Sequence, residues 1–314
     1  MTSLVVPVEL AHPAQALLGE GPLWDDSTQR LRWVDILGRS LHDYDPVAGI
    51  DSHESFPQPV TTVALSKSRG LLVALADRIV ALPAPGAAPI ELNHFRADST
   101  KVRFNDGKAD PWGGFQVGTM HLDGAEAVGH LYRLSPDYSL EVRLSGLTCS
   151  NGLDWSEDGK TFFHVDSVLS KVDTYSTDAD TGKMTGRRGF LEVSGPGIPD
   201  GLSLDADGCV WVAIWGGGEV RRLTPDGTVD RVVKLPVSRV TSVAFGGEDR
   251  DELFITTARD GLSEGELVRE RHAGDLFWCR PGTSGRPANR FLGNLREPAE
   301  AQNAAAGKKG ADAI

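Results

Sequence analysis

The sequence predicts a single all-β domain, a six-bladed β-propeller whose blades each have four antiparallel strands and surround a central channel. Three observations support this fold class. Apolar and polar residues alternate over short stretches, whereas few stretches keep the spacing of an amphipathic helix. The 36 Gly and 18 Pro residues favour many tight turns over long helices. Similar segments recur about every 41–49 residues, the period of a four-stranded blade.

Several stretches alternate as strands do, and turn-forming residues separate them. The expected strands include residues 30–36, 71–82, 129–137, 160–166, 209–215, 219–227 and 252–258. Between strands stand stretches such as DDSTQ, SKSRG, SEDGK, DADG and TPDG, whose Asp, Ser and Gly suit hairpin turns. Short strands joined by tight turns are typical of a propeller.

The blades are defined by internal repetition. Units begin near Gly21, Thr62, Asp106, Gly152, Gly201 and Ser242. The fourth and fifth units, residues 152–178 and 201–227, align without a gap. We therefore predict one propeller domain over residues 1–298, with an N-terminal strand that closes the ring, and a disordered Ala/Gly-rich tail over residues 299–314.

Composition excludes several classes of function. The chain has 32 Lys and Arg against 44 Asp and Glu, a net charge of −12, with no basic run, so no nucleic-acid partner is expected. It has no signal-peptide pattern and no apolar run of about 20 residues, so we expect a cytoplasmic protein without a membrane partner. Its three cysteines, Cys149, Cys209 and Cys279, match neither a disulfide framework nor a zinc spacing and are expected as buried thiols. A monomer or weak homodimer is expected.

Three oxygen-bearing side chains occupy the same place in different units. Glu20, Asn151 and Asp200 each precede a Gly and the start of an inner strand. Inner strands of a propeller start near one mouth of the channel, so these side chains should converge there. Two carboxylates and an amide suit a hard divalent cation and leave positions open for water and substrate. The alternative is that Asn151 and Asp200 only form turns.

A second cluster opens the third unit, in the stretch RFNDGK. Asn105 stands where the other units carry their axial residue, and Arg103 stands two positions earlier. A guanidinium and an amide are suited to an oxygen-rich ligand. The alternative is a plain turn with a solvated Arg103.

These motifs resemble the senescence marker protein/gluconolactonase/luciferin-regenerating enzyme family. The resemblance is carried by LGEGPLW, RFNDGKADPWGGF, GTM, SNGLDWS, PDGLSLDADGCVWVAIW and TSVAFGG, in this order over about residues 15–293. It implies a six-bladed propeller with one catalytic divalent metal ion, Ca²⁺ or Zn²⁺ ahead of Mn²⁺, Mg²⁺ or Fe²⁺. The implied metal ligands are Glu20, Asn151 and Asp200, and the implied substrate contacts are Arg103 and Asn105.

The sequence departs from the family at two positions that bear on the substrate. Animal members carry Glu three residues after GTM, where this chain has Asp123, and Gly114 stands where the family often has Arg. We expect Asp123 to bind a sugar diol in place of that Glu, or to be a plain loop acid.

The resemblance implies hydrolysis of a sugar lactone, such as glucono-, xylono- or arabinonolactone, to the aldonic acid, with Asp200 as general base. Three alternatives are kept: an organophosphate or other ester hydrolase, a calcium-binding regulatory protein, and a propeller that only binds partners. The GLSEG stretch at 261–265 matches the serine-hydrolase pattern without its strand–turn–helix context and is taken as a chance match. DADTG at 178–182 lacks the final Glu of a calcium loop. Trp215 is expected to pack between strands rather than line the channel.

Overall fold

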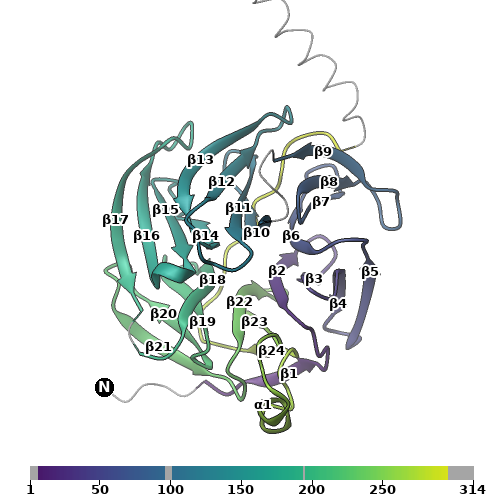
Figure 1. Ribbon diagram of the computed structural model, residues 1–314, viewed down its shortest axis with the longest axis vertical. Helices are drawn as coiled ribbons and strands as arrows, with labels where there is room; N and C mark the ends of the chain where they lie inside the picture. Colours follow the sequence, from purple (N-terminus) through teal and green to yellow (C-terminus); the bar gives the residue numbers. More distant parts are fainter. Residues whose placement is uncertain (1–5, 96–100, 194, 296–314) are drawn as a thin grey trace, which may run out of the picture.

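The computed structural model describes residues 6–95, 101–193 and 195–295. Within them, six four-stranded antiparallel sheets stand around a central axis, and Figure 1 shows β2, β6, β10, β14, β18 and β22 nearest to that axis. The six-bladed propeller predicted from the sequence is confirmed. The predicted tail, residues 299–314, lies outside the described residues. No helix in the described ranges is long and apolar enough to cross a membrane.

The first three blades follow the chain in order. They consist of β2 (Gly19–Asp25), β3 (Arg30–Asp35), β4 (Ser40–Asp45) and β5 (Ile50–Ser55); β6 (Val60–Leu65), β7 (Leu71–Leu75), β8 (Arg78–Leu82) and β9 (Ile90–His94); and β10 (Val102–Ala109), β11 (Phe115–His121), β12 (Gly129–Leu134) and β13 (Leu140–Leu147). The predicted strand at 71–82 is two strands, because Ala76 and Asp77 make a two-residue turn between apolar runs.

The other three blades complete the ring. They consist of β14 (Ser150–Trp155), β15 (Thr161–Asp166), β16 (Lys171–Thr177) and β17 (Met184–Glu192); β18 (Ile198–Leu204), β19 (Val210–Trp215), β20 (Glu219–Leu223) and β21 (Val229–Lys234); and β22 (Val240–Gly246), β23 (Glu252–Thr257), β24 (Leu276–Cys279) and β1 (Glu9–His12). The described helices are a 3₁₀ turn, Ser167–Leu169, and α1, Glu264–Arg269.

An N-terminal strand closes the ring, as predicted. Strand β1 pairs antiparallel with β24, with Glu9 opposite Trp278 and Leu10 opposite Phe277. The sixth blade is thus built from both ends of the chain. Apolar side chains pack between adjacent blades, and the largest of them are fully buried, such as Trp33, Trp155 and Trp211. This packing holds the inner strands at fixed places around the axis.

The segment after β24 runs across the far ends of the inner strands. We call residues 281–295 the C-terminal belt. Its contacts reach all six blades, through the pairs Arg290–Asp25, Phe291–Leu65, Leu292–Gly113, Arg286–Trp155, Gly285–Asp205 and Gly285–Arg250. The belt therefore covers the end of the channel opposite the starts of the inner strands.

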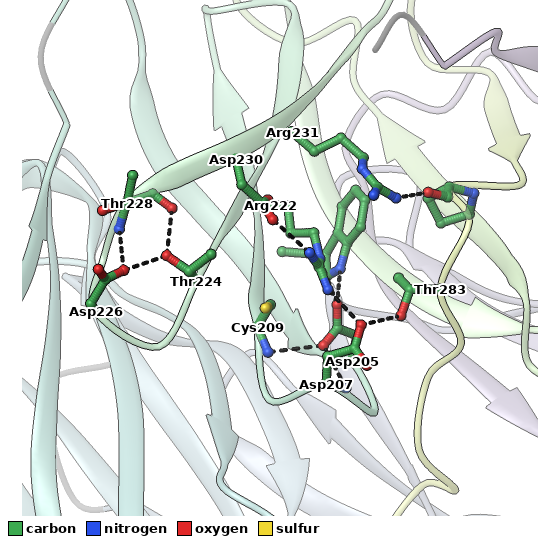
Figure 2. A network of polar contacts seen from close by, with 12 residues as sticks. Asp205, Asp207, Cys209, Arg222, Thr224, Asp226, Thr228, Asp230, Arg231 and Thr283 are labelled. Atoms are coloured by element: carbon green, nitrogen blue, oxygen red, sulfur yellow. Dashed lines mark hydrogen bonds and ion pairs between the residues drawn. The ribbon is translucent and has the colours of Figure 1, made fainter. Parts of the chain in front are cut away.

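A buried ionic network anchors the belt to the fifth blade (Figure 2). Asp205 is fully buried, and its carboxylate accepts hydrogen bonds from Cys209 N at 2.8 Å, Trp211 Nε1 at 2.9 Å and Arg222 Nε at 2.8 Å. Arg222 also donates to Asp207, which accepts a hydrogen bond from Thr283 of the belt. A buried carboxylate with this many donors is fully compensated, so removing it leaves the Arg222 charge buried with less compensation.

We expect Asp205→Ala to lower the free energy of unfolding by about 3–5 kcal/mol, because one partner of a buried pair is lost. Urea denaturation followed by tryptophan fluorescence measures this change. Asp226→Ala is the matched control, because Asp226 lies in the exposed turn between β20 and β21 of the same blade, where its carboxylate accepts hydrogen bonds from Thr224 and Thr228. A loss of stability no larger than that of the control would contradict the role of Asp205.

His164 gives the fold a pH dependence. It lies buried on β15, where Nε2 is 2.8 Å from Ser150 Oγ, and burial lowers its pKa from 6.5 to about 4, assisted by the charge of Arg187 and opposed by that of Asp173. As the pH falls, His164 is therefore protonated in the unfolded chain before it is protonated in the folded protein. The contribution of His164 to the free energy of unfolding is full above pH 6.5 and is lost between pH 6.5 and about 4.

When the pH falls from 7 to 5, the free energy of unfolding should therefore fall by about 2 kcal/mol less in His164→Gln than in the wild-type protein. Urea denaturation at both pH values measures the difference, and the exposed His53→Gln variant serves as control. Equal losses in wild type and His164→Gln would refute the assignment.

Candidate functional site

Six equivalent residues surround the channel, one from each inner strand. The far ends of these strands, from Trp24 in β2 to Phe245 in β22, each pair with the beginning of the second strand of their blade. Counting four residues back from each of these ends gives Glu20, Thr61, Asn105, Asn151, Asp200 and Thr241. We call these residues the axial ring, and each of them is at most 6% exposed.

The ring brings the predicted metal-ligating residues to one level of the channel. A break in the strand register falls beside each ring position, as between Asn151 and Leu153 in β14. Thr61 and Thr241 also belong to the ring, and the sequence prediction missed them because a Thr inside an apolar strand carries no turn signal. The stretches VTTVAL and VTSVAF hold them at the same place as Glu20 in GEGPLW.

Glycine follows Asn151 and Asp200 because the inner strands approach each other closely. A Cβ on Gly152 would lie 2.5 Å from Asp200 O, and a Cβ on Gly201 would lie 2.0 Å from Ser242 Oγ. Neither glycine has a positive φ, so the need is space rather than a special turn. Gly21 differs, since its φ of 52° lies in the left-handed region. The repeated acid-or-amide-plus-Gly motif thus reflects packing of adjacent blades.

The two carboxylates of the ring lie close together in a desolvated place. Burial raises the pKa of Glu20 well above its ordinary value, and the charges of Asp200 and Asp106 raise it further. Burial and Asp106 likewise raise the pKa of Asp200, which the neighbouring Asn151 side chain and Arg103 oppose. Two adjacent buried acids are unfavourable unless a cation compensates them.

The donor atoms fit a hard divalent cation. Asn151 Oδ1 and Asp200 Oδ1 are buried and have no hydrogen-bond partner among the described residues. Asn151 Nδ2 donates to Ser167 Oγ at 3.1 Å, and the amide oxygen is the atom left without a partner. The described ranges contain no group of three or more His, Cys, Asp or Glu side chains that could hold a metal ion. Oxygen-only donors favour Ca²⁺, Mg²⁺ or Mn²⁺.

Arg103 and Asn105 lie beside these ring residues and are joined to each other. Arg103 Nη1 donates to Asn105 Oδ1 at 2.7 Å, and Asn105 Nδ2 donates to the carbonyl oxygen of Ser150 at 2.9 Å. Burial lowers the pKa of Arg103, and the charges of Glu20 and Asp200 oppose that shift. The pair thus places fixed donors next to the two acids.

Asp123 lies at the same end of the channel but outside this cluster. It occupies the exposed turn after β11, where His121 pairs with Val102 of β10. Its backbone N–H donates to His121 Nδ1 at 3.2 Å, while its carboxylate makes no hydrogen bond or ion pair with a described residue. The role predicted for Asp123 stays a prediction.

Asp106 is a third acid that sequence reasoning treated only as part of a turn. Burial raises its pKa to about 6, although Lys108 and the Gly107 N–H lower it. It lines a cavity of about 360 Å³ between the axial ring and the C-terminal belt, together with Lys108, Asp154 and Arg286. The stretch NDG predicted a turn, and only the ring geometry shows that Asp106 faces the channel.

The competing motifs have structural roles. In GLSEG, Ser263 caps α1 by a capping box with Glu266. In DADTG, Asp178 Oδ1 accepts hydrogen bonds from the backbone and hydroxyl of Thr181 in an exposed turn. The three cysteines are free and buried, as predicted, and burial raises the pKa of Cys149 to about 12.

The structure also contains a Ser–His–Asp chain that the sequence did not suggest. Ser40 Oγ is 2.9 Å from His42 Nε2, and His42 Nδ1 is 2.6 Å from Asp51 Oδ2. Trp33 Nε1 donates to the other oxygen of Asp51 at 3.1 Å, and Ser40 is only 7% exposed. These hydrogen bonds join strands β3, β4 and β5, so we interpret the chain as structural.

We expect Asp200→Asn to raise the melting temperature of the metal-free protein by about 2 °C or more, because it relieves repulsion between buried acids. The same variant should lose the stabilisation that added Ca²⁺ or Zn²⁺ gives the wild-type protein. Thermal unfolding with a chelator, and then with each ion, measures both effects. The exposed Asp123→Asn serves as control, and an unchanged ion response in Asp200→Asn would exclude Asp200 as a ligand.

Comparison with known proteins finds related sequences and solved structures of similar fold. A family model described as the SMP-30/Gluconolactonase/LRE-like region matches residues 18–259. Regucalcin of Gallus gallus is 38% identical over 296 residues, which cover 92% of this chain and 99% of that protein. Among solved structures, the calcium-binding protein regucalcin of Agrobacterium tumefaciens has a TM-score of 0.88 and 26% identity, over 93% of this chain and 99% of that chain. A luciferin-regenerating enzyme has a TM-score of 0.85 and 30% identity, over 91% and 99%.

Proposed function

Because this chain belongs to the SMP-30/gluconolactonase/LRE-like family, we propose that it is a metal-dependent sugar lactonase. The observation that carries the proposal is the pair of unpartnered buried oxygens, on Asn151 and Asp200, beside the Arg103–Asn105 pair. The chain would act in the cytoplasm as a monomer or weak homodimer on a small molecule, without a nucleic-acid partner.

The reaction adds water to a cyclic ester. A bond forms between the water oxygen and the lactone carbonyl carbon, and the ring C–O bond breaks, so that a carboxylate, a hydroxyl and a proton result. Asp200 is our candidate general base, since a carboxylate held in a buried place can accept the proton of the attacking water. Its position next to Glu20 and Asn151 would hold that water near the lactone carbonyl.

Glu20, Asn151 and Asp200 would hold one divalent ion through oxygen atoms. A cation bound there would supply Lewis-acid stabilisation of the negative charge that develops on the carbonyl oxygen. We propose Ca²⁺ or Zn²⁺, with Mn²⁺, Mg²⁺ or Fe²⁺ as alternatives. Ca²⁺ suits the oxygen-only donors best, and a solved relative is described as a calcium-binding protein.

Arg103 and Asn105 would orient the sugar. The Arg103 donors that Asn105 and Phe104 O leave free can reach ring hydroxyls, and Asp123 in the adjacent turn would accept from a diol. Buried polar groups left unpaired by the wrong epimer are costly, so such contacts discriminate between sugars.

A second candidate function is calcium binding without turnover. The description of the Agrobacterium tumefaciens relative as a calcium-binding protein favours it. The Arg103–Asn105 pair beside the ligands favours catalysis, because a protein that only binds calcium has no need of donors for a second ligand. An ester or organophosphate hydrolase on the same ring is the remaining alternative.

The deciding experiment removes metal with a chelator and restores Ca²⁺, Zn²⁺, Mn²⁺, Mg²⁺ or Fe²⁺ singly. Hydrolysis of five- and six-carbon aldonolactones is followed by proton release. We expect activity to vanish on chelation and return with one ion, and Asp200→Ala to lower kcat by about 100-fold or more.

Asp226→Ala, which removes an exposed acid from the same blade, should keep full activity. Turnover of aryl esters or phosphotriesters but of no lactone would favour the ester-hydrolase alternative. Calcium binding without turnover of any of these substrates would favour the regulatory one.

A further inference from the structure

A second set of equivalent residues lies above the axial ring, towards the mouth. We call it the upper tier; it lies two residues before the ring in each blade. Its members are Leu18, Pro59, Arg103, Cys149, Ile198 and Arg239. Two residues of extended strand rise about 7 Å, roughly the length of a six-carbon sugar. The two charged residues of the tier are both arginines, although the chain has a net charge of −12.

Arg239 has the same backbone position in the sixth blade as Arg103 has in the third. Phe104 pairs with Thr119 next to the register break of β10, and Val240 pairs with Thr257 next to that of β22. Arg103 and Arg239 directly precede Phe104 and Val240. The third and sixth blades stand opposite each other in a ring of six, as β10 and β22 do in Figure 1. The backbones of the two arginines thus lie at opposite walls of the mouth.

The guanidinium of Arg239 is held by its surroundings but is not neutralised by them. Its central carbon lies 4.9 Å from the ring centroid of Trp215, and Nη2 donates to Gly261 O at 3.4 Å. A Cβ on Gly216 would lie 3.5 Å from Nη1, so the side chain lies against glycine backbone.

Arg239 forms no ion pair with a described residue, and its Nε is buried without a partner there. Glu266 is near enough to interact with its charge without pairing, and Asp260 interacts in the same way with Arg103. A partly buried guanidinium with free donors is a suitable site for a carboxylate.

We propose that Arg239, stacked on Trp215, is an anion subsite that binds the carboxylate of an acidic sugar lactone. This inference rests on the proposed lactonase function and names its substrate class: an aldarolactone, whose lactone carbonyl lies at the axial ring while its free carboxylate reaches the upper tier. Trp215 thus has a role beyond the strand packing expected from the sequence, because it orients the guanidinium.

The test compares two lactones that differ at one carbon. D-glucaro-1,4-lactone carries a carboxylate where D-glucono-1,4-lactone carries a CH₂OH group. We expect wild-type kcat/KM to be higher for the glucarolactone, and Arg239→Gln to lower the ratio of the two kcat/KM values by about 10- to 100-fold. Arg239→Lys should recover part of the ratio, and rising salt should lower it in the wild type.

Arg280→Gln is the matched control, because Arg280 also stacks on a tryptophan, Trp278, at 5.6 Å, but belongs to the outer part of the sixth blade. This variant should keep the wild-type ratio. If the ratio of the two kcat/KM values is the same in Arg239→Gln as in the wild type, whether or not both values fall, Arg239 is structural and the subsite is refuted.

A failed lactonase assay would remain distinguishable from a failed subsite. If neither lactone is hydrolysed with any ion, calorimetry with Ca²⁺ present compares binding of D-glucarate and D-gluconate, which differ by the second carboxylate. Tighter binding of D-glucarate that disappears in Arg239→Gln supports the subsite without the reaction. Equal binding of the two acids by the wild type overturns it.

Discussion

Closure of the ring by β1 is the constraint on which the rest of the molecule depends. The sixth sheet is complete only when the N-terminal strand pairs with β24, and this brings the first inner strand against the last. Thr241 Oγ1 then donates to Gly19 O at 2.6 Å, directly beside Glu20. Glu20 can face Asn151 and Asp200 because the circle is closed, since they come from blades far apart in the chain.

Closure has a cost at the axis. Six inner strands approach so closely that Gly152 and Gly201 have no room for a side chain, and two carboxylates are buried side by side. Such a centre opposes folding, because buried charges lose their hydration. Compensated networks elsewhere, such as the one around Asp205, and the apolar packing between blades offset that cost. The rest of the fold thus holds a buried acidic centre that would not be stable alone.

The two ends of the channel are chemically different. The C-terminal belt covers one end and forms the floor of a cavity that Asp106 helps to line. The starts of the inner strands form the other end, where acids lie at the bottom and arginines stand above them. A ligand that carries both a carbonyl oxygen to be polarised and a separate negative charge would fit this order. A cation bound by the acids would attract the oxygen, and the arginines above would attract the negative charge.

By itself the sequence determined the fold class, the repeat and its period, and one candidate residue in four of the six blades, because alternation, turn residues and spacing are local properties. It predicted that Glu20, Asn151 and Asp200 converge, since equivalent positions of a propeller share one axis. It did not show that Thr61 and Thr241 complete the ring, that Asp106 faces the channel or that Arg239 matches Arg103. Those relations depend on strand register and on which blades stand opposite each other. Register and blade placement arise from packing between residues distant in the chain, so the tertiary structure alone decided them.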